Sequence, residues 1–413
     1  MNVYAAQQAV MERITALSVE HIALASAHKR YSAQTYAATM PVPHFERSVM
    51  DGYAVRTADV MHATKDHPIE LQVVAHVACG EVYDAPLAAG EAVRIMTGGQ
   101  VPAGADAVIK LELTSGMGLS GERLHEQRQV QIMSSASVGE NITSIGSEMN
   151  KGDILVKQGQ LLGPGELALL AMFGHRDVQV YSKPKVAIIA TGKELQQPGT
   201  VLEPGRIWNS NSYMLMAQIE EAGGIPDMLP LVGDHVDQLT SQIQAAFQGD
   251  YDAVITIGGV SVGDHDILYE YTQQWNGELL FNKLSMRPGS PTTVGFMAGK
   301  PLFALSGNPS ACYVGCEMFV RPALLGMQGV TEPYRTRMRA RIIDDYRVED
   351  TFVRFVRGIL HADETGSLWV QPTAVDRSNA TISIRDANCL FIVPPSRTGL
   401  DRHTVVDVIP LRI

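Results

Sequence analysis

The sequence lacks any hydrophobic run that approaches the ~20 residues a helix needs to span a bilayer. Its first residues, MNVYAAQQAVMERI, also lack the basic-then-apolar pattern of a signal peptide. We therefore expect a cytoplasmic protein without a membrane segment. Runs of Lys or Arg are missing too, and the formal net charge is −11. This composition argues against a general nucleic-acid binder, although a single pocket on an acidic protein can still be positive.

Cysteine is scarce, and the P-loop pattern GxxxxGKS/T is missing. Of the four cysteines, Cys312 and Cys316 would lie one helical turn apart. No second cysteine or histidine pair stands at zinc spacing. We therefore interpret these two cysteines as small core residues on a buried helix face rather than as metal ligands.

The chain is long enough and apolar enough to form several domains. The chain has 413 residues, of which 45% are hydrophobic, so we expect two to four folded domains. Helical periodicity from Met1 to about Arg30 precedes a stretch of short β-like runs between residues 49 and 138. From Lys185 strands and helices alternate, which predicts a doubly wound parallel sheet. After Met327 only short strands are indicated, which predicts a small β domain.

The same patterns predict individual elements. In the first part of the chain we expect strands at Leu71–Val77, Ala92–Met96, Ala107–Leu111 and Val130–Met133 and a helix around Gly165–Phe173. In the α/β part we expect strands at 186–191, 227–232, 252–257, 279–286 and 302–305, and helices at 212–222, 236–247 and 309–325. In the last part we expect strands at 335–343, 351–360, 367–371, 389–393 and 404–410.

The most informative stretch is Ile255–Asp266, ITIGGVSVGDHD, where a short apolar run stops at a glycine pair. This pattern is typical of a buried strand that ends in a ligand-binding loop, because open α/β sheets bind ligands at the carboxyl ends of their strands. Two loops of similar construction follow other apolar runs, TGKEL at Thr191–Leu195 and SGNPSA at Ser306–Ala311. Glycines allow close backbone approach, so that backbone amides can hold an oxyanion. The three loops predict a ligand site at one edge of the sheet.

Charged residues recur around these loops. Glu194, Asp264 and Asp266 would repel a phosphate unless a cation lay between them, so we hypothesise a divalent cation, Mg²⁺. The structural alternative for Glu194 is an ordinary acid in the first turn of a helix. Arg287 follows the strand predicted at Leu279–Met286, where a guanidinium can bind a phosphate or another oxyanion. Its structural alternative is a surface charge at the sheet edge.

For other motifs, a purely structural role remains an alternative to a role in ligand binding. Asn308-Pro309 suits a helix start whose free amides bind an anion, and it equally suits a well-capped helix with no ligand. Asp51-Gly52 and Thr97-Gly98 are both typical of turns. His265 is a lone loop histidine, which is more often solvated than catalytic.

Eight motifs in order resemble those of the MoeA family, the molybdenum insertases of molybdenum-cofactor synthesis, which are similar to the E domain of gephyrin. The motifs are SVMDGYAVR, RIMTGGxVPxGADAVI, GENI…GSE…GD, ATGKEL, GRIWNSNSYML, GGVSVGDHD, MRPGSP and LSGNPSAC. The resemblance covers nearly the whole chain. It implies an α/β multidomain fold in an elongated homodimer. Its expected parts are a segmented N-terminal domain at 1–45 and 139–178, an inserted β-rich domain at 46–138, a MogA-like doubly wound, mostly parallel sheet domain at 179–327 and a small C-terminal β domain at 328–413.

The resemblance also assigns site residues. The implied catalytic acids are Asp51, Glu194, Asp234, Asp266 and Glu148, and the implied Mg²⁺ ligands among them are Glu194, Asp234 and Asp266. The implied substrate-binding residues are Thr97, Gly98, Thr191, Gly192, Gly258, Gly259, Ser261, Gly263, Arg287, Ser290, Ser306, Gly307, Asn308 and Pro309.

Several positions depart from the family pattern. Glu148 stands where the family has aspartate, and Lys193 stands where many members have aspartate. The familiar K-P-G-K becomes Arg287-Pro-Gly-Ser290, which keeps one cation and loses the other. His235 replaces the second member of an aspartate pair. These changes indicate a variant anion-binding surface.

The activity implied by the resemblance is insertion of molybdate into adenylylated molybdopterin with release of AMP, assisted by Mg²⁺. Asp51 would close the site from the other segment or from a partner subunit. The implied partners are these two substrates, a second subunit and, transiently, other cofactor-synthesis proteins, with no nucleic acid and no membrane. Two alternatives stay open, a MogA-like molybdopterin adenylyltransferase and a non-catalytic gephyrin-like scaffold. The sequence does not distinguish molybdate from tungstate.

Overall fold

The computed structural model describes residues 1–118, 127–233, 235–259, 275–374 and 379–411. The predicted site residues Asp234, Ser261, Gly263 and Asp266 lie outside the described residues. The chain folds as two compact units. Unit 1 consists of Met1–Gln34, Lys157–Ala171 and His175–Ile413, and unit 2 consists of Thr35–Val156 and Met172–Gly174.

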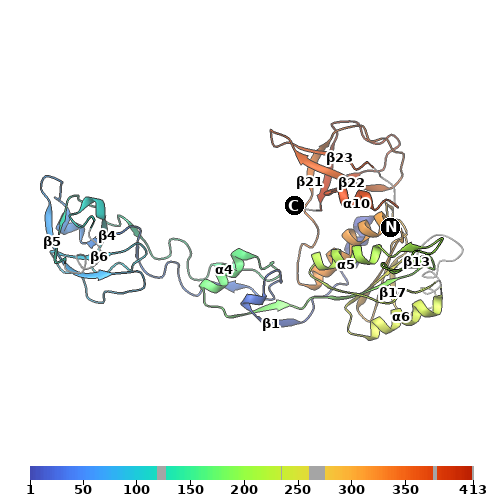
Figure 1. The fold of residues 1–413 in the computed structure, drawn as a ribbon, viewed down its shortest axis with the longest axis horizontal. Helices are drawn as coiled ribbons and strands as arrows, with labels where there is room; N and C mark the ends of the chain where they lie inside the picture. Colours follow the sequence, from blue (N-terminus) through green and yellow to red (C-terminus); the bar gives the residue numbers. More distant parts are fainter. Residues whose placement is uncertain (119–126, 234, 260–274, 375–378, 412–413) are drawn as a thin grey trace. The chain divides into compact units, whose positions relative to one another are not determined.

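A six-stranded sheet forms the centre of unit 1 (Figure 1). Its order is β15 (Ile225–Met228), β12 (Lys185–Ala190), β16 (Ala253–Ile257), β20 (Lys300–Leu305), β19 (Thr293–Met297) and β17 (Glu278–Phe281). The first four strands are parallel and the last two are antiparallel to their neighbours. The structure thus confirms the doubly wound, mostly parallel sheet.

Helices cover both faces of this sheet, which explains why its central strands β12, β16 and β20 are buried over nearly their whole length. Along β12, Ile188 belongs to the core cluster that contains Leu215 and Ile219 of helix α5 (Asn211–Glu221). The next residue, Ile189, belongs to the cluster on the other face, beneath α6 (Val236–Gln248). Alternate side chains of one strand therefore fill two separate cores.

The predicted helix at 309–325 is present as three consecutive helical segments. They are α8 (Pro309–Gly315), the π-helical segment η3 (Cys316–Val320) and α9 (Arg321–Met327). Cys312 and Cys316 are buried in the core, as interpreted from the sequence. Burial raises the pKa of both thiols, so both stay in the protonated form.

The prediction of one helix from Met1 to Arg30 is wrong beyond its first turns. Helix α1 (Val3–Met11) is followed by β1 (Val19–Ala23) and the short 3₁₀ helix η1 (Leu24–Ser26). β1 pairs antiparallel with β11 (Asp177–Tyr181), a partner far away in the sequence. Local periodicity cannot show such a pairing, which overrides helix propensity here. α1 itself packs on unit 1, where Val3, Ala6 and Val10 join the sheet's core.

The last part of unit 1 is a closed five-stranded barrel. Its strands are β22 (Val353–Ala362), β23 (Leu368–Pro372), β21 (Met338–Ile342), β25 (Val405–Pro410) and β24 (Cys389–Val393), and β24 pairs back with β22. These strands match the predicted ones. A short helix, α10 (Ile382–Asp386), was not predicted.

The single strand predicted at 279–286 is wrong. The structure divides it between β17 in the central sheet and β18 (Met286–Arg287), which pairs in parallel with β22 of the barrel. Local periodicity does not predict this break, because each half is stabilised by a different sheet.

Unit 2 contains a five-stranded sheet of order β7 (Ala107–Lys110), β4 (Gly52–Val55), β6 (Glu91–Ile95), β5 (Ile69–Val77) and β8 (Gln129–Ile132). Two small pairs accompany it, β3 (Arg47–Ser48) with β9 (Ile142–Thr143) and β2 (Tyr36–Ala37) with β10 (Ile154–Val156). The strands expected around residues 71, 92, 107 and 130 are all present. A short helix, α2 (Thr57–Val60), follows β4.

Two further elements complete the description. The predicted helix at 165–173 is α4 (Pro164–Met172), which begins with Pro164. The small parallel pair β13 (Leu195–Gln196) and β14 (Ile207–Trp208) lies beyond the end of β12, and the 3₁₀ helix η2 (Leu111–Leu113) follows β7. None of the helices in the described part of the chain has the length and hydropathy that a membrane crossing requires.

Candidate active site

The carboxyl ends of β12, β16 and β20 meet at one edge of the central sheet, as the sequence predicted. Thr191 follows β12 and donates to the carbonyl oxygen of Ile257 twice, from its backbone N at 2.9 Å and from its hydroxyl at 3.2 Å. Gly258 follows β16 and donates from N to the Leu305 carbonyl at the end of β20, at 3.0 Å. Backbone hydrogen bonds therefore hold the starts of all three loops in fixed relative positions.

Gly258 is required at this edge for a steric reason. Its φ of +88° lies in the left-handed region, and a Cβ placed on it would lie 2.7 Å from the Thr191 carbonyl oxygen. Gly307 lies just beyond the end of β20. A Cβ placed on Gly307 would lie 3.6 Å from the Cα of Gly258. Gly258 thus lets its loop approach the Thr191 backbone closely, and the next glycine, Gly259, is half-buried.

Glu194 is the one predicted acid of this edge that the structure describes. Its carboxylate folds back over Gly192, where a Cβ would lie 2.5 Å from both carboxylate oxygens. Its backbone carbonyl accepts from Ile207 N at 2.8 Å, which ties the loop to β14. The side chain is exposed to solvent, so its oxygens are accessible to a ligand.

Asn211 is a site residue that the sequence reasoning did not select. At the start of α5, its Nδ2 donates to the Gly307 carbonyl at 2.8 Å. Just before it, the Asn209 side chain and Ser212 are hydrogen-bonded at 2.9 Å. These polar residues belong to the motif GRIWNSNSYML. Its Asn-Ser-Asn run directly after an apolar pair is the sequence feature that indicates polar site residues here.

A pocket of about 290 Å³ adjoins the end of β20, and three arginines line it. Arg287 comes from β18, and Arg354 and Arg357 come from β22 of the barrel. The remaining lining includes the loop Pro288–Pro291 and Ser306, Asn308 and Ala311. We call this the arginine pocket. It contains the predicted residues Arg287, Ser290, Ser306 and Asn308, while Pro309 is the first residue of α8 beside it.

One carboxylate is shared between two of the three arginines. Asp350, with a side chain only 7% exposed, accepts from Arg354 Nη1 at 2.7 Å and lies 3.2 Å from Arg287 Nε. Burial alone would raise the pKa of Asp350, but the bond from Arg354 and the charges of both arginines outweigh burial and lower it. Asp350 is therefore ionised, and it forms ion pairs with two of the three arginines that line the pocket.

The third arginine is almost fully buried. Arg357 is 1% exposed and donates from Nε to the Ser383 hydroxyl at 2.8 Å. Burial strengthens the field of this charge at the pocket, because the surrounding dielectric constant is low. Arg354 and Arg357 belong to the motif Arg-Phe-Val-Arg within a strand. This motif alone does not predict a site, because neither arginine follows a glycine loop.

The two serines of the pocket differ in what they can offer. Ser306 accepts from Asn308 N at 3.3 Å, which leaves its own hydroxyl proton for a ligand. Ser290 donates its hydroxyl proton to the Leu284 carbonyl at 2.8 Å, so the hydroxyl is used to shape the loop. Of the two, Ser306 is the better donor for an oxyanion.

In unit 2, the structure brings Asp51 and Thr97 together. Asp51 Oδ1 accepts from both the backbone N and the hydroxyl of Thr97, each at 2.7 Å. The backbone bond lowers the pKa of Asp51 most, followed by the hydroxyl bond, while the charge of Arg94 has a smaller effect. Gly98 follows with φ +80° and donates to Ser48 O at 2.8 Å. The turn expected here is therefore present, and it fixes an ionised carboxylate.

Glu148 has a different partner in the same unit. Its carboxylate forms an exposed ion pair with Arg47 Nη2 and, within the described part of unit 2, is not hydrogen-bonded to Asp51 or Thr97. Exposed ion pairs contribute little to stability, about 0–1 kcal/mol. The structure therefore does not place Glu148 with the other predicted acids of unit 2.

No cluster of three or more His, Cys, Asp or Glu side chains occurs among the residues that the structure describes, which omit 234 and 260–274. The acids predicted to share a cation with Glu194 lie in that omitted part. The donor type at Glu194 fits Mg²⁺, because its accessible carboxylate oxygens are hard ligands.

The fold and these features define an α/β protein with an arginine-lined pocket where its sheet meets a β barrel. Three family models match the chain and together cover most of it. They are the MoeA N-terminal region (domain I and II) over residues 1–174, a probable molybdopterin binding domain over 187–326 and the MoeA C-terminal region (domain IV) over 339–411. The chain therefore belongs to the MoeA family.

Individual relatives agree with this membership. Proteins named molybdopterin molybdenumtransferase are 40% identical over 95% of the chain and 90% of the relative in Bacillus subtilis, and 39% identical over 98% and 92% in Staphylococcus aureus. A solved structure titled as a molybdopterin biosynthesis MoeA protein from Pyrococcus horikosii has 29% identity and a TM-score of 0.84. The match covers 100% of this chain and 99% of that one.

Proposed function

We propose that this protein is a molybdopterin molybdenumtransferase of molybdenum-cofactor biosynthesis, which inserts molybdate into adenylylated molybdopterin and releases AMP. The observation that carries the proposal is the similarity over nearly the full chain to curated relatives with that name. Neither the adenylyltransferase nor the scaffold alternative is favoured, because all three MoeA-type segments are present.

The arginine pocket supports an anionic substrate. Molybdate is a small tetrahedral dianion, and the pocket brings three arginine side chains to a volume of about 290 Å³. Arg287 and Arg354 are held in place by Asp350, and Ser306 offers a hydroxyl donor. In this proposal the pocket binds and orients molybdate before it reaches the pterin sulfurs. Preformed positive charge of this kind lowers the barrier without a covalent enzyme intermediate.

The glycine edge supports binding of the phosphate and pterin parts of the other substrate. At Gly258 the Thr191 carbonyl leaves no room for a side chain, and neither Gly258 nor Gly307 carries one, so a ligand can contact the main chain directly. The loops at 191–194 and 306–309 flank this edge and belong to the same hydrogen-bonded network. We assign Thr191, Gly192, Gly258, Gly259 and Gly307 to substrate binding on this basis.

Carboxylates supply the remaining chemistry of the proposal. Glu194 would hold Mg²⁺ together with Asp234 and Asp266, and when bound the ion would neutralise the charge of the substrate's pyrophosphate. Asp51 is a second, separate carboxylate, kept ionised by its two bonds from Thr97. We assign Asp51 a role in catalysis on the basis of that fixed negative charge, and Glu148 a lesser one.

We also propose a cytoplasmic homodimer that contacts other cofactor-synthesis proteins transiently. The support is family membership and, for location, the finding on membrane helices given above. Analytical ultracentrifugation of the full chain tests the dimer directly, and a monomer at micromolar concentration would contradict it.

The activity test uses the purified chain with adenylylated molybdopterin, with and without molybdate. We expect AMP release that depends on molybdate. AMP release that is absent, or that is equal without molybdate, would refute the proposed reaction.

The pocket is tested with Arg287→Gln and a matched control, Arg347→Gln. Both arginines have side chains 55% exposed, and both form ion pairs with aspartate, but Arg347 lies outside the pocket. We expect R287Q to weaken molybdate binding in calorimetry by roughly fivefold, the value of an exposed charge contact of about 1 kcal/mol. R347Q should leave binding unchanged. Equal affinities in the two variants would remove the arginine pocket from the proposal.

A further inference from the structure

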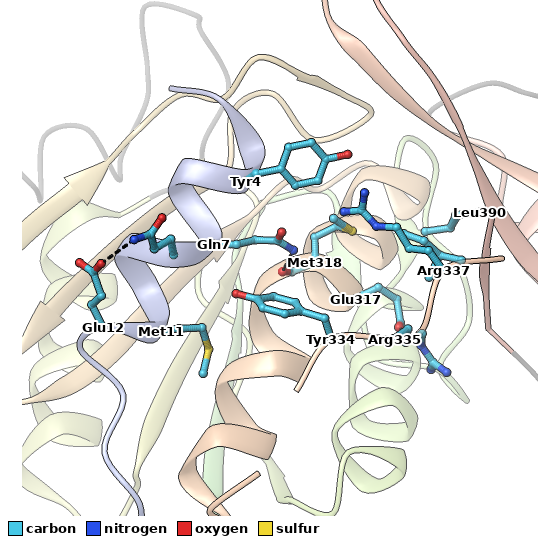
Figure 2. Close-up of a pocket in the computed structure, with 12 residues that line it drawn as sticks. Tyr4, Gln7, Met11, Glu12, Glu317, Met318, Tyr334, Arg335, Arg337 and Leu390 are labelled. Carbon is cyan, nitrogen blue, oxygen red and sulfur yellow. Dashed lines mark hydrogen bonds and ion pairs between the residues drawn. The ribbon is translucent and has the colours of Figure 1, made fainter. Parts of the chain in front are cut away.

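A second and larger cavity, of about 700 Å³, lies in unit 1 and shares no lining residue with the arginine pocket. Figure 2 shows it between helix α1, the segment around Tyr334–Arg337 and η3. Side chains of β24 and β25 complete the lining. The reaction proposed above uses none of these residues.

The floor of this cavity is apolar and adaptable. Met11 and Met318 lie on it, together with Leu390 and Ile409 from the barrel. Methionine side chains are flexible and polarisable, so they adjust to apolar ligands of different outline. A volume of this size is typical of small-molecule sites, which are mostly apolar with a few polar groups that fix orientation.

Two of the four charged side chains that line the cavity neutralise each other. Arg335 donates from Nε to Glu317 Oε2 at 2.8 Å, and both side chains are largely buried. Gln218 satisfies the other oxygen of Glu317 at 3.0 Å. This ion pair forms a closed unit behind the cavity, so it leaves no net charge for a ligand.

Arg337 differs from its neighbour Arg335. Its guanidinium lies 4.7 Å from the ring centroid of Tyr4, in a cation–π contact, and it forms no ion pair within the described part of the chain. Figure 2 shows Arg337 at one end of the cavity and Glu12 at the other. A ligand with a single negative charge is therefore attracted to the Arg337 end and repelled from the Glu12 end, which sets its direction.

We propose that this cavity is a binding site for a small amphipathic carboxylate. The apolar or aromatic body lies on Met11 and Met318, and the carboxylate pairs with Arg337. Tyr4 holds the guanidinium in place for that contact, since the cation–π interaction limits its rotamers. The site is separate from the proposed active site, so it does not depend on the activity proposed above.

The test uses the full chain with methyl-labelled methionine, observed by NMR. The probes are indole-3-acetate and its uncharged amide, indole-3-acetamide. Leucine substitutions at Met11 and Met318 assign the two methyl signals, because this exchange preserves volume. We expect indole-3-acetate to shift both signals in a saturable way and the amide to bind more weakly.

Three variants make the result specific. Arg337→Gln should weaken indole-3-acetate binding by roughly fivefold, as an exposed charge contact predicts, and should abolish its advantage over the amide. The control Arg339→Gln removes a charge two residues away, on a side chain 78% exposed and outside the cavity, and should change nothing. Gln8→Trp, at an exposed position of α1 that lines the cavity, should fill it and block both probes.

Several outcomes would overturn the proposal. One is that neither methyl signal shifts at millimolar probe. Another is that the acid and the amide bind equally, or that R337Q and R339Q behave alike. A third is binding of a blocked peptide with one phenylalanine and one aspartate when neither free probe binds, because the cavity would then be a protein-docking surface.

Discussion

Asp350 contacts two arginines of the arginine pocket. Replacing it with asparagine removes its negative charge and keeps its shape, so the variant tests the charge alone. Oδ2 accepts from Arg354 Nη1 and lies near Arg287 Nε, and Oδ1 accepts from the backbone N of Phe352 at 3.1 Å. Asparagine has the same outline and can still accept from Phe352. The variant D350N therefore removes the negative charge with little change in packing.

The expected loss of stability follows from the two arginine contacts. A hydrogen bond to a charged group contributes about 1.5–3 kcal/mol when it is buried. The Arg354 contact is close to that case, with side chains 21% and 7% exposed, whereas the side chain of Arg287 is 55% exposed and solvent screens its contribution. We expect D350N to lower the free energy of unfolding of unit 1 by about 2 kcal/mol at pH 7.

The pH dependence of this difference has a definite sign. The arginines lower the native pKa of Asp350 below its ordinary value of 3.8. The stabilisation is therefore present above the unfolded-state pKa and is lost as the pH falls through the native pKa. The gap between wild type and D350N should be full at pH 7, nearly full at pH 5 and smaller below pH 3.8.

Urea unfolding followed by circular dichroism at several pH values measures the gap from the midpoint shift. Glu203→Gln is the matched control, because Glu203 lies 3.7 Å from Arg206 with its side chain 66% exposed. That variant should differ from wild type by less than about 0.5 kcal/mol. If D350N is as stable as wild type at pH 7, or if its deficit grows in acid, the ion-pair reasoning is wrong.

Three other variants test the sheet edge and the second carboxylate. G258A should destabilise unit 1 by about 2 kcal/mol in urea unfolding and slow AMP release. The control G205A, at φ +77° with open space around it, should lower the free energy of unfolding by only about 1 kcal/mol. Equal effects of the two substitutions would contradict the steric argument. E194Q should lower AMP release and weaken its dependence on Mg²⁺ with an unchanged melting temperature, and a normal magnesium titration would count against that ligand. T97V should raise the pKa of Asp51, so the acid side of the pH–rate profile for AMP release should move to higher pH; an unmoved profile would show that Asp51 does not govern it.

The sheet edge could be predicted from the sequence because its signals are local. An apolar run followed by glycine and polar residues marks the carboxyl end of a buried strand. Parallel pairing then brings such ends together without further information. The contacts between Thr191, Ile257 and Gly258 are a direct result of this pairing.

The arginine pocket could be predicted only in part, because half of it depends on contacts between distant segments. Arg287 follows an apolar run and was selected, whereas Arg354 and Arg357 lie within an ordinary strand of the barrel. The break between β17 and β18 has the same origin: two different sheets compete for one apolar segment. The strand β1 was missed for this reason too, since its partner β11 is more than a hundred residues away.

The register between β18 and β22 bears on the proposed binding of an anion in this pocket. Arg287 is paired directly with Arg354 across the two parallel strands. Like charges on paired residues destabilise a sheet, and Asp350 lies against both guanidinium groups and offsets part of their repulsion. If molybdate binds there as proposed, it adds negative charge beside both arginines in the folded state only. By mass action, that binding should then also stabilise the junction between the central sheet and the barrel.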